Sequence, residues 1–132
     1  MPFDVVLSPA RQCRKARGLQ NHLAGYAAED SVARHYEERG VSICARNWRG
    51  SVGEIDIVGR DGAVMVFVEV KQSRTHDLAA SHVSPAQIDR IFASVEEYVG
   101  REPQGLLTDV RIDLALVDGQ GRIEVLENAF AG

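Results

Sequence analysis

The strongest constraint in this sequence is a hairpin signal between residues 53 and 71. Two runs rich in valine and isoleucine, residues 54–58 and 64–70, flank the turn-forming sequence Gly-Arg-Asp-Gly. Apolar, β-branched runs on both sides of such a turn predict two antiparallel strands. Acidic residues and a lysine stand inside these runs, where a plain core strand would carry more valine or isoleucine. The hairpin therefore has to expose these charges or neutralise them.

The alternation of side chains along a strand indicates which of these charges lie together. Glu69 and Lys71 share one face of the second strand. A two-residue turn within residues 60–62 pairs positions whose numbers sum to 121 or to 123. Both sums are odd, so Asp56 is expected on the face of Glu69 and Lys71 in either register. In the second register Glu54 lies opposite Glu69, and Asp56 is its diagonal neighbour, roughly 7–8 Å away.

Carboxylates gathered on one face repel one another unless a cation neutralises them. Mg²⁺ is usually held by one or two carboxylates together with waters and phosphate oxygens. Asp56 and Glu69 are the expected ligands, and Mn²⁺ is expected to substitute for Mg²⁺. Lys71 would then lie beside the attacking water and a scissile phosphate. The spacing alone equally allows a strand pair whose solvated face carries acids and a lysine.

Length and composition point to one folded domain of 132 residues. Two cysteines without a CxxC pair indicate a reducing cytoplasm, and no apolar run reaches the length of a membrane helix. Residues 1–50 hold eight basic and five acidic residues, whereas residues 51–132 hold seven and fourteen. The basic excess predicts a solvated, disordered segment over residues 1–20 rather than a phosphate-contacting arm, followed by a single domain over 21–132.

The remaining elements follow from hydrophobic periodicity. Helices are predicted over residues 23–39 and 85–99, a polar loop over 72–82, and further strands over 41–48, 110–116 and 122–126. Ser84 and Gln87 form a capping box for the second helix, whose apolar stripe includes Phe92. This order predicts an α/β fold, with a mixed five-stranded sheet flanked by helices.

Two further groups of charged residues are functional candidates. Glu29 falls within the apolar stripe of the first helix, and an acid there needs a partner or a cation. Its position alone favours a stripe-edge glutamate that reaches solvent or a nearby arginine. Arg46, Arg49 and Arg74 are the candidates for binding nucleic-acid phosphates.

An ordered set of short motifs then suggests a family. The motifs are Gly25-x-x-x-Glu29, Arg46-Asn47-Trp48-Arg49, Gly53-Glu54-Ile55-Asp56, Phe67-Val68-Glu69-Val70-Lys71, Arg111-x-Asp113 and Asn128-Ala129-Phe130. Together they resemble the YraN-like family of predicted bacterial endonucleases, which is similar to archaeal Holliday-junction resolvases and to the PD-(D/E)XK nuclease-like proteins. The resemblance covers about residues 25–130, and the set is far more specific than any single piece.

The resemblance implies a restriction-endonuclease-like core and a Mg²⁺-dependent endonuclease that acts on DNA, including branched DNA. Asp56, Glu69 and Lys71 match the acids and the lysine of the family motif. Glu29 matches the acid of the first helix, so the resemblance makes it a third metal ligand. Cutting a four-way junction needs two sites, which implies a homodimer.

Two departures from the family pattern keep an alternative open. Gln87 stands where relatives often carry lysine, and Ser73 stands where they often carry arginine. Both changes remove positive charge that could hold phosphate. The alternative is a non-catalytic module that uses a nuclease-like fold to bind nucleic acid or protein, and a purely structural subunit is a third hypothesis.

Overall fold

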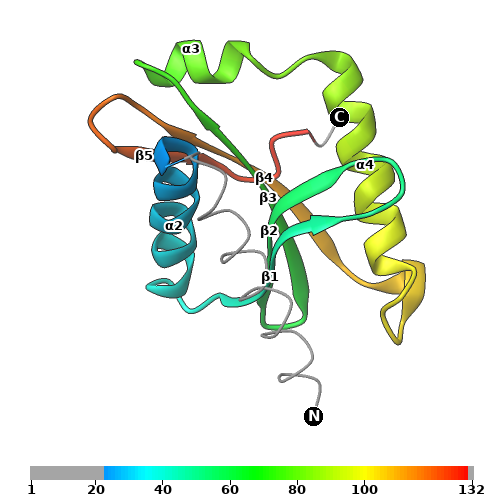
Figure 1. Cartoon of the computed structure of the whole chain (residues 1–132). Coiled ribbons are helices and arrows are strands. Elements are labelled where there is room, and N and C mark those ends of the chain that lie inside the picture. The colour runs from blue at the N-terminus through cyan, green and yellow to red at the C-terminus, as the bar shows by residue number, and fades with distance from the viewer. Residues whose placement is uncertain (1–22, 131–132) are drawn as a thin grey trace.

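The computed structural model describes residues 23–130, so the basic segment predicted over residues 1–20 lies outside the described range. The elements in chain order are α2 (Leu23–Glu37), β1 (Ser42–Arg49), β2 (Glu54–Asp61), β3 (Val64–Gln72), α3 (His76–Ser81), α4 (Pro85–Val99), the 3₁₀ helix η1 (Gly105–Leu107), β4 (Val110–Val117) and β5 (Ile123–Leu126) (Figure 1). None of the helices among these residues is long and apolar enough to cross a membrane.

The five strands form one sheet in the order β1-β2-β3-β4-β5. Neighbouring strands are antiparallel except for β3 and β4, which are parallel. Parallel neighbours need a long crossover connection, and here α3 and α4 supply it. The predicted α/β fold with a mixed five-stranded sheet is therefore confirmed.

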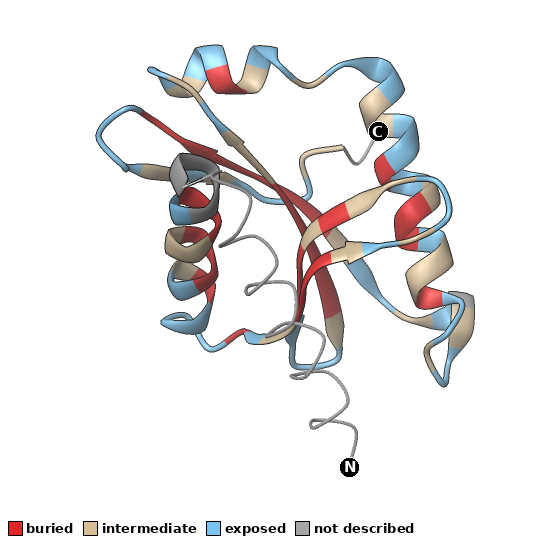
Figure 2. Ribbon diagram, in the orientation of Figure 1, coloured by how far each residue is buried: buried red, intermediate tan, exposed pale blue. Residues whose placement is uncertain are grey.

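Helix α2 covers one face of the sheet, and α4 covers the other (Figure 1). The inner side of α2 carries the predicted stripe of small and aromatic residues. Ala28, Val32, Ala33 and Tyr36 are buried against β2, β3 and β4. The red segments of Figure 2 show the same concentration of buried residues on the central strands and on the sides of the helices that face them. The site residues described below lie at the end of the sheet between these two helices.

One residue that was predicted to be buried on the inner side of α4 is exposed instead. Ile91, Val95 and Val99 are buried in the second core cluster. Phe92 was predicted for the same stripe, but it is 42% exposed, and Ser94 is fully buried instead. A small residue is needed there because the hairpin approaches closely: a Cβ atom on Gly53 would lie 3.2 Å from the Ser94 Oγ.

The hairpin turn falls later in the chain than the sequence suggested. Asp61 pairs with Val64, so the paired numbers sum to 125 rather than to 121 or 123. Gly62, at a φ of 62°, takes the first turn position, where a type II′ turn requires a positive φ. Because the sum is still odd, Asp56 keeps its place on the side of Glu69. The predicted register was wrong, but the prediction that Asp56 and Glu69 share one side of the hairpin is confirmed.

The segment predicted as a loop over residues 72–82 contains a short helix, α3. The Thr75 side chain caps it by accepting a hydrogen bond from the Leu78 amide. Ala79 is fully buried, in a cluster with Leu114 and Leu116 of β4. Hydrophobic periodicity could not reveal a helix this short, because one turn and a half contains too few residues to show a repeat.

Candidate metal centre

The ends of β2 and β3 separate at the point where the acidic residues stand. The β2–β3 ladder ends at the pair Ile57 and Val68. One residue further out, the Asp56 side chain replaces the ladder, and its Oδ2 accepts a hydrogen bond of 2.8 Å from the Val70 amide. A carboxylate thus occupies the gap where the strands part. This fork is the place toward which the other candidate residues converge.

Glu69 and Lys71 extend along β3 beyond the fork, where β3 pairs with β4. Glu69 is only 9% exposed. Its Oε2 lies 3.4 Å from the Lys71 Nζ and accepts a 3.1 Å hydrogen bond from Gln87 Nε2, in the first turn of α4. The Ser84 hydroxyl accepts a hydrogen bond from the Gln87 amide as predicted, but the Gln87 side chain donates to Glu69 rather than returning to Ser84. Gln87 binds the site carboxylate instead.

Glu29 reaches the same region from α2, on the other side of the sheet. It is 8% exposed. Asn47 Nδ2 donates to Glu29 Oε1 and also to Glu54 Oε2, each at 3.0 Å. The Arg46 guanidinium lies 3.9 Å from Glu29 Oε1. A buried carboxylate of α2 and a partly exposed carboxylate of β2 are therefore joined through one amide nitrogen.

The electrostatics of the fork show that these carboxylates interact. Burial, followed by the negative charges of Glu69 and Glu29, raises the pKa of Asp56 well above its ordinary value. Burial also raises the pKa of Glu69, although the neighbouring Lys71 ammonium opposes this effect. Glu54 adds further negative charge to both groups. The folded protein thus keeps acids together at a cost in free energy that a bound cation would reduce.

The donor set fits a hard divalent cation, because its members are carboxylates and they repel one another. Coordination requires the side chains to move. Among the residues that the structure describes, no three His, Cys, Asp or Glu side chains already stand close enough to hold one ion. Glu69 is bound by Lys71 and Gln87, and Glu29 is bound by Asn47. Rotation of these carboxylates toward Asp56 would exchange the present partners for the cation.

The three arginines predicted to bind nucleic acid lie in different surroundings. Arg46 is 6% exposed, and its guanidinium forms a 2.9 Å ion pair with Asp30 of α2. This position suits a residue that supports the site better than one that contacts phosphate. Arg49 is well exposed and pairs with Glu54 at 2.9 Å. Arg74 is exposed in the segment between β3 and α3.

Comparison with known proteins assigns the family. The sequence pattern of Uncharacterised protein family UPF0102 matches residues 28–117. The chain belongs to the UPF0102 (YraN-like) family. A UPF0102 protein of Ruegeria pomeroyi is 53% identical over 115 residues, which cover 87% of this chain and 94% of the relative. A UPF0102 protein of Cereibacter sphaeroides is 51% identical over 114 residues, covering 86% and 97%.

A third UPF0102 protein, from Roseobacter denitrificans, is 50% identical over 123 residues, covering 93% of this chain and 95% of the relative. The segment matched by the UPF0102 pattern, residues 28–117, includes all of the predicted site residues. These are Glu29, Arg46, Arg49, Asp56, Glu69, Lys71 and Arg74. The family assignment thus covers the fork and both helices that contribute to it.

Three residues of the UPF0102 chain join the site without having been predicted for it. Glu54 could have been found, because it stands two positions before Asp56 and faces the same charges. Gln87 was predicted as a helix cap and noted as a position where relatives often carry lysine, but its contact with Glu69 depends on how α4 packs. Asn47 entered the prediction only as part of the motif Arg46-Asn47-Trp48-Arg49, because its contacts depend on a backbone φ of 51° inside a strand.

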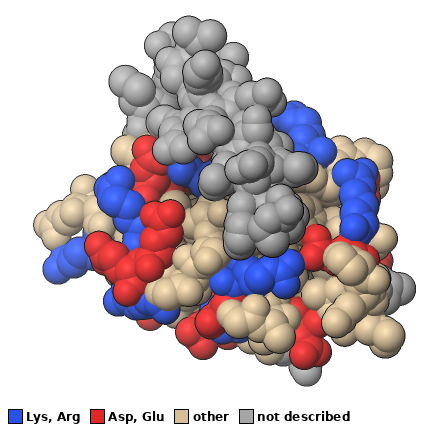
Figure 3. Space-filling model, turned by 90° about the horizontal axis from the view of Figure 1, so that it is seen from below, with Lys and Arg blue, Asp and Glu red and all other residues tan. Residues whose placement is uncertain are grey.

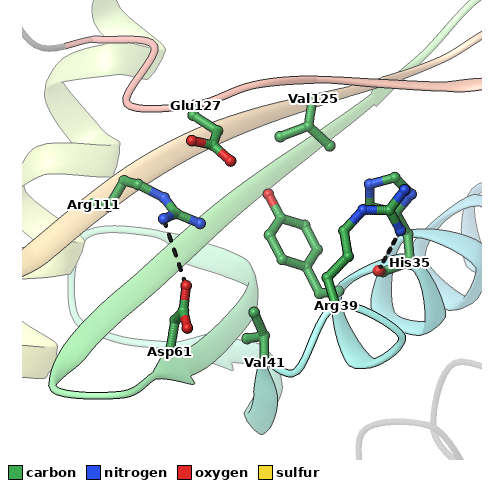
Figure 4. Close-up of a pocket in the computed structure, with 8 residues that line it drawn as sticks. His35, Arg39, Val41, Asp61, Arg111, Val125 and Glu127 are labelled. Atoms are coloured by element: carbon green, nitrogen blue, oxygen red, sulfur yellow. Dashed lines mark hydrogen bonds and ion pairs between the residues drawn. The ribbon is translucent and has the colours of Figure 1, made fainter.

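A separate hollow lies on the α2 side of the sheet, about two helical turns along α2 from Glu29 (Figure 4). The cavity is about 260 Å³ and is lined by His35, Tyr36, Arg39, Val41, Asp61, Arg111, Val125 and Glu127. The Arg111 side chain that lines it is paired within the protein, because its guanidinium lies 3.0 Å from Asp113 and 3.8 Å from Asp61. On the face drawn in Figure 3, basic and acidic side chains are interspersed, so the described residues visible there form no continuous basic patch.

Proposed function

We propose that this UPF0102 chain is a Mg²⁺-dependent endonuclease that hydrolyses phosphodiester bonds of DNA, including branched DNA, in the cytoplasm. The observation that carries the proposal is that three acids and one lysine lie around the fork between β2 and β3, within electrostatic reach of one another. Asp56 and Glu69 come from the two strands, Glu29 comes from α2, and Lys71 lies 3.4 Å from Glu69. The restriction-endonuclease-like resemblance adds support, because these four residues match its motif.

The proposed metal ligands are Asp56, Glu69 and Glu29. The raised pKa values of Asp56 and Glu69, caused first by burial and then, for Asp56, by neighbouring carboxylates, support a site that is short of positive charge. Asp56 is held by the Val70 amide through Oδ2, and the hydrogen bond fixes this carboxylate at the fork. Mn²⁺ has the same preference for oxygen ligands and is expected to replace Mg²⁺.

Bound Mg²⁺ would supply positive charge to the scissile phosphate and lower the pKa of a coordinated water. Hydrolysis would form a new P–O bond from water and break the P–O bond to the leaving oxygen, and the proton lost by the water would reach that leaving oxygen through solvent. Lys71 would release Glu69 to the cation and donate instead to the phosphate oxygen on which negative charge develops. Arg49 and Arg74 are the proposed contacts to flanking phosphates, because both are exposed.

Two such sites would be needed to cut both strands of branched DNA, so the proposal includes a homodimer for that substrate. Cutting of linear or flapped DNA needs only one site. The dependence of cleavage on protein concentration therefore separates the two substrate classes, because a weak dimer loses junction cutting first on dilution.

A second candidate function is a non-catalytic module that binds DNA or protein. Lys71 and Gln87 already bind Glu69, and the described acids stand too far apart to share an ion without rotating. A module of this kind could keep these contacts permanently. It predicts salt-dependent DNA retention without cleavage.

The decisive experiment is cleavage of labelled linear, flapped and four-way DNA with Mn²⁺ by the wild type and by Lys71→Ala. Asp61→Asn is the matched control for Asp56→Asn, because both acids lie on β2 and Asp61 stands at the turn, away from the fork. We expect Lys71→Ala and Asp56→Asn to lose at least about a hundredfold in rate, and Asp61→Asn to retain the wild-type rate.

Equal cutting by the wild type and Lys71→Ala would show that the activity belongs to another site or to a contaminant. Intact DNA of every shape, together with measurable binding, would favour the binding module. Calorimetric titration with Mn²⁺ adds an independent measurement: the proposed metal site predicts that Asp56→Ala loses heat of binding that Asp61→Asn retains.

A further inference from the structure

We propose that Asn47 is the positioning residue of the carboxylate site, and that Glu54 belongs to the same site through it. This inference rests on the proposed function. It depends on two features of β1: a left-handed residue inside a strand and an amide shared by two acids.

The backbone of Asn47 reverses the normal alternation of β1. Ala45 packs in the core cluster on the α4 side, and Arg46 pairs with Asp30 on the α2 side. A regular strand would then return residue 47 to the α4 side. Instead Asn47 contacts Glu29 of α2, while Trp48 packs in the cluster on the α4 side. The φ of 51° accounts for this reversal and points two consecutive side chains toward α2.

This conformation costs free energy for most residues, because the Cβ atom crowds the backbone at positive φ. Glycine adopts it without strain but has no side chain, whereas asparagine adopts it more readily than other residues and carries an amide. The position therefore combines a tolerated left-handed backbone with a hydrogen-bond donor. A strand that needed only the bend could use glycine.

The amide connects two elements of the site. Its Nδ2 lies 3.0 Å from Glu29 Oε1 of α2 and 3.0 Å from Glu54 Oε2 of β2. The Arg49 guanidinium holds the other oxygen of Glu54 at 2.9 Å. Glu29 and Glu54 are thereby oriented toward the fork as a pair, one of them a proposed metal ligand.

The Glu29 and Glu54 carboxylates also influence the two acids at the fork. Both Glu29 and Glu54 lie near enough to Asp56 and Glu69 to act on them electrostatically. Partners that orient metal ligands typically contribute a factor of 10 to 100 in metal affinity. We therefore assign Asn47 the role of setting the separation of the carboxylates before a cation arrives.

The test is calorimetric titration of the full chain with Mn²⁺, comparing the wild type with Asn47→Gly. Glycine keeps the left-handed backbone and removes the amide, so the melting temperature of the metal-free protein should fall by no more than about 7 °C, the effect of two lost hydrogen bonds. We expect the Mn²⁺ affinity to fall at least about tenfold. Glu54→Gln, at a partly exposed residue, should also weaken Mn²⁺ binding by several fold.

Asn128→Gly is the matched control. Asn128 also has a φ of 51°, but its contact with Asp113 uses the backbone amide, which glycine retains. This variant should bind Mn²⁺ like the wild type. Two double variants sharpen the test, because Asn47 acts through the carboxylates of Glu29 and Glu54. The Mn²⁺ affinity of Asn47→Gly/Glu29→Ala should be no lower than that of Glu29→Ala/Glu54→Gln.

The outcomes separate this inference from the proposed function. Wild-type affinity in both Asn47→Gly and Glu54→Gln would overturn the positioning role while leaving the metal site standing. A large fall in melting temperature for Asn47→Gly, with unchanged Mn²⁺ affinity, would also overturn it by showing a purely structural role. Absence of Mn²⁺ binding by the wild type would overturn both the proposed function and this inference.

Discussion

Two aspartates of this UPF0102 protein lie on β2 and β4, the strands on either side of β3, and their surroundings differ. Asp113, on β4, is fully buried and accepts hydrogen bonds from the Tyr36 hydroxyl at 2.6 Å, the Asn128 amide at 2.9 Å and the Arg111 guanidinium at 3.0 Å. Asp56, on β2, accepts one from the Val70 amide and faces other carboxylates.

This difference separates an acid whose charge is compensated within the fold from an acid whose charge is not. The partners of Asp113 come from α2, β4 and the segment after β5, so the aspartate connects three parts of the fold and its charge is compensated by Arg111. Asp56 gathers acids around itself and raises the electrostatic cost of the folded state. Burial by itself therefore does not identify a site, whereas incomplete compensation of buried charge does.

The largest expected effect comes from Asp113→Asn. The amide of asparagine would place a donor among the donors of Tyr36 and Arg111, and the charge opposite Arg111 would be lost. We expect the free energy of unfolding to fall by about 3 kcal/mol, measured by urea denaturation. A loss below about 1 kcal/mol would contradict the structural role of this aspartate.

The same substitution at the fork, Asp56→Asn, should act in the opposite direction. The raised pKa means that the folded state binds more protons than the unfolded state between pH 4 and the folded pKa, so wild-type stability falls as the pH rises through this range. Each unit by which the pKa is raised costs about 1.4 kcal/mol at higher pH. The asparagine oxygen can still accept the Val70 amide.

We therefore expect Asp56→Asn to exceed the wild type in stability by at least about 1 kcal/mol at pH 7.5, and to lose this advantage near pH 4. Urea denaturation at both pH values measures the difference. Equal destabilisation at the two values would show that the Asp56 charge stabilises the fold.

A divalent cation should distinguish the two aspartates directly. Mg²⁺ or Mn²⁺ at ten times its dissociation constant should stabilise the wild type by about 1.4 kcal/mol, which raises the melting temperature by about 5 °C. Asp113→Asn should retain this increment, whereas Asp56→Asn should lose it. Potassium chloride at equal ionic strength is the control, and an increment retained by Asp56→Asn would exclude that residue as a ligand.

The smallest expected effect comes from Tyr36→Phe. Burial and the neighbouring Asp113 carboxylate raise the pKa of the Tyr36 hydroxyl, so it remains a donor across the accessible pH range. Its removal leaves Asp113 with Arg111 and Asn128, and we expect a loss of about 1 kcal/mol in the free energy of unfolding. The stabilisation by Mn²⁺ should not change. A reduced Mn²⁺ increment would show that the Asp113 network and the fork are coupled.

Much of the fold could be predicted because local rules decide it. Alternation along β3 put Glu69 and Lys71 on one face, and any register with an odd sum put Asp56 beside them. The turn itself was placed too early, because Gly59 and Gly62 both permit a turn and only the pairing of complete strands selects one. For this reason Asp56, Glu69 and Lys71 could be placed on one side of the hairpin despite the wrong register.

The parts that could not be predicted depend on packing between elements. Phe92 and Ser94 lie within one turn of α4, and the close approach of Gly53 decides which of them faces inward. The contact of Gln87 with Glu69 required the first turn of α4 to lie over the end of β3. Neither arrangement leaves a periodic signal in the sequence.

Helices α2 and α4, the strands, the mixed sheet and the shared side of Asp56, Glu69 and Lys71 could be predicted from the sequence, because periodicity and capping act over a few neighbouring residues. Helix α3 was missed because it is too short to show a periodicity. Contacts between distant segments determine that Arg46 is buried against Asp30, that Asn47 turns toward Glu29, and that Tyr36 and Asn128 reach Asp113. The physical reason is that compensation of a buried charge depends on which groups from distant segments reach it, and chain distance does not set that reach.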